Sequence, residues 1–224
     1  SARASARLSP EACSDSIGHR SSSSCLITLV LMPSDSAALV RICTVGNSGS
    51  GKSTFARSLS QQLNLPAIEL DSIFHQPGWT QLPGDEFRQE VVRRLAEAEK
   101  SRGGWVVDGN YMSRLPDVTV GHADVVVWFD LPRPRVMWQL TKRTLHRVST
   151  KRELWNGNVE RWSTLVKWAP EENILRWAWT QHAKYRETYE RLSAGSSARW
   201  IRITNPRERD MAMSSLVAEY KSKR

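Results

Sequence analysis

The sequence is poor in cysteine and has no long apolar run, and both absences exclude classes of protein. Only three of its 224 residues are cysteine, an odd number that forms no disulfide framework, and a chain of this length needs none. The longest clear apolar run, residues 25–32, is far shorter than the roughly 18 residues of a membrane helix. No internal repeat is visible. A disulfide scaffold, a membrane span and a fibrous repeat are therefore excluded.

The composition fits one globular α/β domain of ordinary size. Apolar residues make up 40% of the chain and charged residues 25%, which permits a packed core. The net charge is +9, and the positive excess lies in the C-terminal part, where residues 133–192 carry 13 basic and 6 acidic side chains. This imbalance suits an anionic ligand, whether a nucleic acid, a nucleotide or a sugar phosphate.

Residues 1–36 differ from the rest of the chain. Serine and alanine dominate them, and no period of 2 or 3.6 emerges. We expect a disordered tail, added vector sequence or an over-called upstream start, with Met32 as the natural initiator. A targeting peptide is the alternative, because residues 25–32 resemble a short apolar h-region. Glu11 and Asp15 leave the stretch before it only weakly basic.

From residue 37 onward, apolar runs typical of strands alternate with amphipathic segments typical of helices. Strands are expected at residues 38–45, 67–70, 105–107, 124–129 and 200–204. Helices are expected at residues 52–63, 85–100, 134–149 and 172–193, with a last one beginning near Pro206. In residues 85–100 the apolar face would hold Phe87, Val91, Val92 and Leu95. The alternation predicts an α/β fold of three layers, α/β/α, with a parallel five-stranded sheet.

One stretch fits the phosphate-loop pattern G-x-x-x-x-G-K-[ST] at every fixed position, between an expected strand and an expected helix. Its residues are Gly46, Asn47, Ser48, Gly49, Ser50, Gly51, Lys52 and Ser53, followed by Thr54. The glycines allow a tight turn whose N–H groups cradle phosphate oxygens at a helix N-terminus. Lys52 can reach the β and γ phosphates, and the Ser53 hydroxyl can ligate Mg²⁺. A bland Gly- and Ser-rich turn is the alternative, but the spacing and context favour binding of ATP.

The chain resembles the adenylate-kinase-like branch of the P-loop NTPases, and within it the family called DNA topology modulation proteins. The resemblance extends from about residue 40 to 220. It is carried by residues 46–54, 70–79, 105–111, 128–132 and 154–158. It implies a P-loop kinase-like domain at residues 37–224, with a helical lid or insert, rich in Trp and Arg, over about residues 133–193.

The resemblance implies roles for carboxylates that follow strands. Asp71 would orient or deprotonate the acceptor hydroxyl, and a helix N-cap is its alternative role. Asp108 would hold Mg²⁺ through water, together with Ser53, and a strand-end turn is the alternative. Asp130 also follows an apolar run, as a metal-binding acid would, but a structural role in a turn matches it better.

The resemblance also implies a catalytic set in which Lys52 and Asp71 are joined by arginines over the transferred phosphoryl group. Arg143 and Arg147 lie four apart and face the same side of a helix, where positive charge would stabilise the transition state. A solvated helix face is the alternative. In adenylate-kinase-like proteins backbone groups after the last strand line the adenine pocket, and here that loop contains Asn205 and Pro206.

Two departures from the adenylate kinases put an AMP acceptor in doubt. Those enzymes follow their Asp-Gly with Phe-Pro-Arg, whose arginine holds the acceptor nucleotide, whereas Asn110 and Tyr111 follow here. Their adenine-stacking arginine, about four residues before the position of Arg143, is replaced by Gln139. Arg114 is a candidate substitute for the missing acceptor arginine, although nothing in the spacing requires it.

Tryptophan is abundant in the expected insert. Five of the ten tryptophans fall within 25 residues: Trp155, Trp162, Trp168, Trp177 and Trp179. Interleaved with basic residues, they resemble a surface on which the bases of a nucleic acid stack. The alternative is a helical insert whose small core is built from large aromatic side chains. Trp177 and Trp179 are two positions apart and cannot share one helix face.

The sequence therefore predicts an ATP- and Mg²⁺-dependent kinase, acting on a small molecule or nucleotide, that transfers the γ-phosphoryl group in line to an anionic acceptor. The alternatives are a nucleotide-dependent nucleic-acid-binding or regulatory protein and a polynucleotide 5′-kinase. We expect a cytoplasmic monomer or homodimer whose partners are ATP and the acceptor, with nucleic acid as a less favoured partner and no membrane association.

Overall fold

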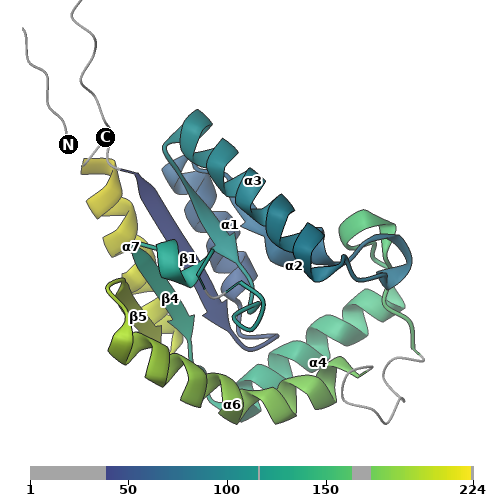
Figure 1. Ribbon diagram of the computed structural model, residues 1–224. Helices are drawn as coiled ribbons and strands as arrows, with labels where there is room; N and C mark the ends of the chain where they lie inside the picture. The colour runs from purple at the N-terminus through teal and green to yellow at the C-terminus, as the bar shows by residue number, and fades with distance from the viewer. Residues whose placement is uncertain (1–38, 116, 163–172, 223–224) are drawn as a thin grey trace, which may run out of the picture. The chain divides into compact units, whose positions relative to one another are not determined.

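The computed structural model describes residues 39–115, 117–162 and 173–222, so the predicted tail lies outside the described residues. Five parallel strands form one sheet in the order β2-β3-β1-β4-β5 (Figure 1). They are β1 (Val40–Gly46), β2 (Ala67–Glu69), β3 (Gly104–Asp108), β4 (Val125–Phe129) and β5 (Arg199–Ile203). The predicted five-stranded parallel sheet is confirmed, with β1 at its centre.

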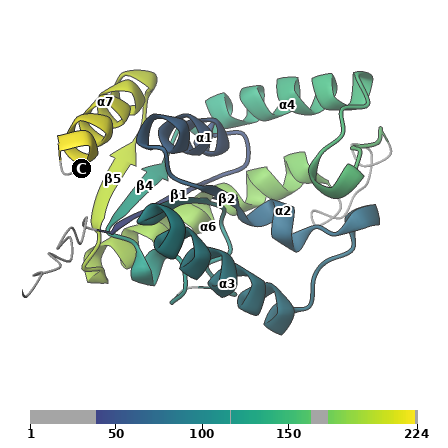
Figure 2. The same ribbon diagram turned by 90° about the horizontal axis from the view of Figure 1, so that it is seen from above.

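Helices cover both faces of the sheet (Figure 2). One face packs against α1 (Lys52–Leu63) and α7 (Pro206–Ser222), and the other against α3 (Gly84–Arg102) and α6 (Ile174–Gly195). The described chain also contains α2 (Leu70–Phe74), α4 (Arg133–Ser149) and the 3-10 turns η1 (Pro77–Trp79), η2 (Val120–His122) and η3 (Trp155–Gly157). The predicted three-layer α/β/α architecture is confirmed. Within the described ranges, no helix is both long and apolar enough to cross a membrane.

The inner strands of the sheet, β3, β1 and β4, are buried on both faces, which explains why they are nearly continuous apolar runs in the sequence. Every residue of β3 and β4 is buried. From α3, Phe87, Val91 and Leu95 enter the core as predicted, but Val92 is 46% exposed. The prediction for Val92 is wrong because each helical residue is rotated by about 100° from the one before it. Val92 therefore points away from the stripe that the other three form.

The described part of the predicted insert contains helices α4 and α6, and α6 belongs to the core of the domain. α4 and α6 pack against each other. Tyr189 of α6 is fully buried, and its ring centre lies 5.9 Å from that of Trp128 in β4. The C-terminal half of the insert is thus fixed to the sheet.

Because the strands are parallel, their carboxyl ends share one edge of the sheet, which is where ligands bind in open α/β folds. The phosphate loop follows β1, Asp71 comes two residues after β2, and Asp108 ends β3. These three strands are neighbours in the sheet. The topology alone therefore brings the loop and both carboxylates to one edge.

Gly104 begins β3 with φ +150°, and an added Cβ would overlap the carbonyl group of Val40 in β1. We expect Gly104→Ala to lower the free energy of unfolding by at least about 2 kcal/mol, because two paired strands must move apart. Gly84→Ala is the control, since a Cβ there meets open space. It should be neutral or stabilising by up to about 1 kcal/mol. Denaturant unfolding measures both, and equal stabilities would contradict the prediction.

Candidate active site

The phosphate loop joins β1 to α1 and leaves the N-terminus of that helix open. No side chain caps α1, and Lys52 is its first residue. The N–H groups of the first turn and the positive end of the helix dipole therefore face the loop. Ser50 adds a buried hydroxyl that has no hydrogen-bond partner among the described residues. These features suit the binding of phosphate oxygens.

Helices α4 and α6 of the insert both contact the phosphate loop. The Nδ2 of Asn47 donates to the carbonyl of Ala178 in α6 at 2.7 Å, and its Oδ1 accepts from the Ser48 N–H at 2.8 Å. A Cβ at Gly49, where φ is +86°, would lie 2.7 Å from the Cβ of Leu140 in α4, so only glycine permits this approach. The side chain of Asn47, a predicted nucleotide-binding residue, thus fixes the loop in place.

Asn110 holds the start of the loop, a role that the sequence analysis missed. Its Oδ1 accepts from the Gly46 N–H at 2.9 Å, and its Nδ2 donates to the Gly46 carbonyl. The hydroxyl of Tyr189 donates to the same Oδ1 at 3.0 Å. Only a side chain with both a donor and an acceptor can make this pair of bonds. The one signal in the sequence was an amide residue directly after Asp-Gly at a strand end.

Asp108 lies beside the loop and is only 5% exposed. The Thr44 hydroxyl donates to its Oδ1 at 3.0 Å, and the Ser53 hydroxyl lies close enough to lower the pKa of this carboxylate. Burial raises the pKa of Asp108, against the opposing effects of the Lys52 charge and the two hydroxyls. The structure thus brings together Ser53 and Asp108, the predicted Mg²⁺ residues. Their oxygen donors fit this hard cation, which commonly takes one or two carboxylates and completes its shell with phosphate and water.

Asp71 lies in the first turn of α2, where the Tyr111 hydroxyl donates to its Oδ1 at 2.8 Å. The N-cap alternative is wrong, because Glu69 occupies the cap position and no side chain caps α2. Burial raises the pKa of Tyr111, so its phenol stays a proton donor at neutral pH. The charge of Asp71 raises the pKa of Asp108 and also acts on Arg143. Asp71 is therefore close enough to Asp108 and Arg143 to interact electrostatically with both.

α4 contributes Arg143 to this group of charges. Its Nε is buried and has no hydrogen-bond partner in the described part of the chain. Burial and the adjacent Arg147 lower the pKa of Arg143 to about 10, and the charges of Glu160, Asp71 and Asp108 act in the opposite direction. Arg147 is held by Glu160 in an ion pair of 3.0 Å. Of the predicted pair, Arg143 thus keeps a free donor near the carboxylates, whereas Arg147 is engaged within the insert.

Residues 70–79 and 154–158, two of the stretches that carry the family resemblance, contact each other. Residues 154–158, the docking loop, lie against α2 and η1. Their side chains bond as follows: Trp155 to Glu69, Asn156 to Ser72 and His75, and Asn158 to Gln76 and Trp79. Asn158 is only 3% exposed; it donates to the Gln76 carbonyl at 3.0 Å and accepts from the Trp79 N–H at 2.8 Å. The insert is thus fixed to the segment that carries Asp71.

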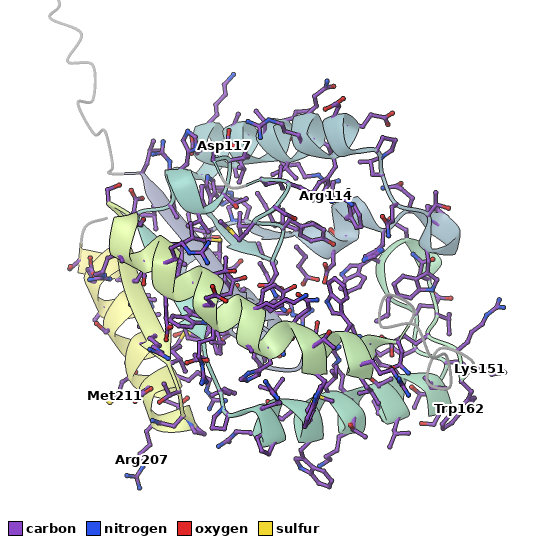
Figure 3. All side chains as sticks on the ribbon, turned by 60° about the horizontal axis from the view of Figure 1, so that its bottom comes forward. Arg114, Asp117, Lys151, Trp162, Arg207 and Met211 are labelled. Carbon is purple, nitrogen blue, oxygen red and sulfur yellow. The ribbon has the colours of Figure 1, made fainter. Side chains whose placement is uncertain are left out.

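The two neighbouring tryptophans of α6 differ in exposure. Trp177 is half-buried, whereas Trp179 is 54% exposed with the Arg133 guanidinium 4.9 Å from its ring centre. This agrees with the prediction that the two cannot share a helix face. Figure 3 shows Trp162 at the outer end of the insert, and Trp168 lies outside the described residues.

Asp130 has a structural task, in line with its expected role as a turn residue. Its carboxylate is buried and forms ion pairs with Arg186 of α6 at 2.9 Å and with Arg202 of β5. These pairs join the end of β4 to its neighbours in the fold.

Asn205 and Pro206 begin α7. The Oδ1 of Asn205 accepts from the Glu208 N–H at 3.0 Å, and the Glu208 carboxylate accepts from the Thr204 N–H at 2.7 Å. This reciprocal pair resembles a capping box, except that the Glu208 carboxylate binds the N–H of the residue before the cap. The side chain of Asn205 is therefore engaged in capping, which leaves backbone groups as the means of any contact with adenine.

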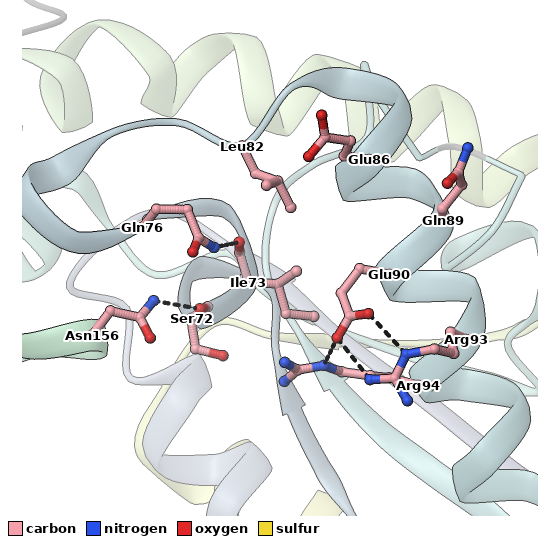
Figure 4. Close-up of a pocket in the computed structure, with 10 residues that line it drawn as sticks. All are labelled: Ser72, Ile73, Gln76, Leu82, Glu86, Gln89, Glu90, Arg93, Arg94 and Asn156. Atoms are coloured by element: carbon pink, nitrogen blue, oxygen red, sulfur yellow. Dashed lines mark hydrogen bonds and ion pairs between the residues drawn. The ribbon is translucent and has the colours of Figure 1, made fainter.

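A cavity of about 530 Å³ lies between α2 and α3 (Figure 4). Glu90, bonded to Arg93 and Arg94, forms one wall, and Asn156 of the docking loop lies at another. None of the predicted site residues lines it. The cavity is therefore separate from the phosphate loop.

Comparison with known proteins yields solved structures alone. No family model matches the sequence, and no curated protein does. A shikimate kinase from Bacteroides thetaiotaomicron is similar with a TM-score of 0.49 and 14% identity, over 82% of this chain and 99% of that one. A gluconokinase from Sinorhizobium meliloti 1021 has a TM-score of 0.42 and 18% identity, over 82% and 97%.

Arg143 is a cation whose burial works against the unliganded fold. We expect Arg143→Met to leave the free energy of unfolding without nucleotide unchanged or higher, because a buried group lacking a full set of partners is removed. On the kinase hypothesis, ATP turnover should fall by at least about 100-fold, because the variant loses the guanidinium charge that would stabilise the negative transferring phosphoryl group. Arg147→Met, which breaks the pair with Glu160, should instead destabilise the chain. A marked loss of unliganded stability in Arg143→Met would show that the residue is structural.

Proposed function

We propose that the chain is an ATP- and Mg²⁺-dependent phosphotransferase that moves the γ-phosphoryl group in line to a hydroxyl of a small anionic acceptor. The proposal rests on the placement of Asp71 and Arg143. A carboxylate held by Tyr111 and a guanidinium with a free donor face the space beside Lys52 and Asp108. A protein that only binds a nucleotide needs neither group, whereas phosphoryl transfer uses both.

On the donor side, the N–H groups of the loop and of the first turn of α1 would bind the triphosphate. Lys52 would reach the β and γ phosphates. Ser53 and Asp108 would hold Mg²⁺, which supplies charge neutralisation at the phosphates. The bonds of Asn110 to Gly46 keep the loop in the shape that this binding requires.

On the acceptor side, Asp71 would take the proton of the attacking hydroxyl. The new bond forms between the acceptor oxygen and the γ-phosphorus, the bond from that phosphorus to the β–γ bridging oxygen breaks, and ADP leaves. Tyr111 binds one carboxylate oxygen of Asp71 and leaves the other for the acceptor. Arg143 would stabilise the charge on the transferring group, and Arg147, held by Glu160, would position the turn that carries it.

A second candidate is a nucleotide-dependent nucleic-acid-binding protein, and a polynucleotide 5′-kinase lies between the two. Trp138 and Trp179 favour it, because both are exposed and have Lys142 and Arg133 at 5.6 and 4.9 Å from their ring centres. Exposed indoles beside cations are typical of proteins that bind single strands. The resemblance to the DNA topology modulation proteins does not identify a substrate.

The deciding experiment is ATP turnover with Mg²⁺ against nucleoside monophosphates, nucleosides, phosphorylated metabolites and 5′-hydroxyl oligonucleotides. ADP that forms only with one acceptor class would support phosphotransfer and identify that class. Lys52→Ala should bring this turnover to background without unfolding the chain, and unchanged turnover would overturn the site assignment. ATP binding without acceptor-stimulated turnover, with salt-dependent binding of oligonucleotides, would support the second candidate.

Asp71→Asn separates the two sides of the site. The amide can still accept from Tyr111 but cannot take a proton, so acceptor-dependent kcat should fall by about 10²- to 10⁴-fold. ATP affinity, measured by calorimetry, should stay unchanged. Asp210→Asn, at an exposed position of α7, is the control and should change neither value. Loss of ATP binding in Asp71→Asn would place this carboxylate on the donor side.

A further inference from the structure

The cavity of about 530 Å³ between α2 and α3 lies on the side of α2 that faces away from Asp71 (Figure 4). Ile73, which lines the cavity, follows Asp71 by two positions and is therefore rotated from it by about 200°. Of the residues that the structure describes, ten line the cavity, and Asp71 and its partner Tyr111 are not among them. The volume is that of a small-molecule site. The cavity therefore suits a ligand other than the nucleotide and the acceptor.

Both arginines of the cavity wall are already paired with carboxylates. Arg93 and Arg94 bind Glu90 at 2.8 and 2.7 Å, and these bonds lower the pKa of Glu90 to about 2. Arg93 also pairs with Glu97 at 3.0 Å. Glu86 of the same wall, in contrast, is exposed and forms no hydrogen bond or ion pair with any described residue. The unpaired charge that faces the cavity is thus negative, in a chain whose net charge is +9.

The docking loop and the segment after α2 add neutral hydrogen-bond acceptors to the wall. Asn156 donates through its Nδ2 to the carbonyls of Ser72 and His75, at 3.0 and 2.6 Å. Gln76 donates through its Nε2 to the carbonyl of Ile73 at 2.8 Å. Within the described ranges, the amide oxygens of Asn156 and Gln76 therefore have no donor. Unused acceptors favour a ligand that donates hydrogen bonds.

The cavity also has an apolar part. Ile73 is 2% exposed and Leu82 is half-buried, and both line the cavity. Figure 4 shows their side chains extending into the space between Gln76 and Glu90. A ligand with a short carbon chain can cover this apolar surface while its polar ends reach the wall.

We propose that this cavity binds a small aliphatic ammonium compound. A charged nitrogen pairs with Glu86. N–H groups of the ligand donate to the amide oxygens of Gln76 and Asn156, and its carbon chain packs on Ile73 and Leu82. The site is independent of the proposed function, because it shares no residue with the phosphate loop or the acceptor carboxylate.

A ligand in this place contacts α3, the segment after α2 and the docking loop at once. It therefore holds the docking loop against the segment that carries Asp71, and the site is regulatory. The Trp79 N–H reports this docking, because it donates to the Oδ1 of Asn158 in the docking loop at 2.8 Å. Exchange of this amide hydrogen should be slower when the ligand is bound.

Glu86 has an alternative role, because an acidic side chain in the first turn of a helix interacts favourably with the helix dipole. Asp85 lies in the same turn but does not line the cavity, so Asp85→Asn is the matched control for Glu86→Gln. Gln89 lines the cavity, is exposed and has no partner in the described part of the chain. Gln89→Glu therefore adds a negative charge to the wall and should act in the opposite direction.

Binding to the full chain is measured by titration calorimetry with 1,4-diaminobutane, 1,4-butanediol and succinate, which share a chain length and differ in charge. We expect the diamine to bind at least about tenfold more tightly than the diol, and succinate to bind more weakly than either. Glu86→Gln should weaken binding of the diamine by about tenfold, and Gln89→Glu should strengthen it. Asp85→Asn should leave it unchanged. The net positive charge of the chain disfavours non-specific binding of a dication.

Equal affinity for the three probes, or a preference for succinate, would overturn the proposed site. So would an equal loss of diamine binding in Glu86→Gln and Asp85→Asn. Where Glu86→Gln fails to unfold cooperatively, diamine binding that is not strengthened in Gln89→Glu would overturn it instead. Diamine binding without slower exchange at Trp79, followed by NMR, would overturn the regulatory link to the docking loop. None of these outcomes depends on ATP turnover, so phosphotransfer stands or falls separately.

Discussion

One side-chain amide, that of Asn110, fixes where the phosphate loop begins. It binds the N–H and the carbonyl of Gly46 and accepts a bond from Tyr189. These residues belong to β1, the segment after β3, and α6, so the sheet, the loop and the insert meet at one point. Losing one partner would leave buried polar groups unsatisfied, which costs more than the bond itself contributes. The rest of the site is placed relative to this loop and depends on that contact.

The space beside the loop holds two cations and two carboxylates that are partly or largely removed from water. Burial raises the pKa of Asp108 and lowers the pKa of Arg143, so both groups are driven toward their neutral forms. A nucleotide with its metal ion brings charges of both signs. The cation can pair with Asp108 while the phosphates pair with Lys52 and Arg143. The unliganded arrangement is thus one that the proposed magnesium nucleotide would complete.

Local patterns predicted the sheet, the long helices and the phosphate loop, because each depends on residues a few positions apart. Val92 is apolar but exposed, which shows that hydrophobicity alone does not assign a residue to the buried face of a helix. The five-residue α2 is too short to show a helical period. The contacts of Asn110 with Gly46 and of Asn158 with Trp79 join residues 64 and 79 positions apart, and no local period encodes them.

The insert contacts both the phosphate loop and the α2 segment that carries Asp71. α6 accepts the bond from Asn47 of the phosphate loop, and the docking loop binds the α2 segment that carries Asp71. Glu160, two residues beyond the docking loop, holds Arg147 one turn from Arg143. A movement that undocked the insert would therefore disturb the phosphate loop, Asp71 and Arg143 together. A helical insert that only offered a surface to nucleic acid would not need these three connections, whereas a phosphotransferase needs all of them set at once.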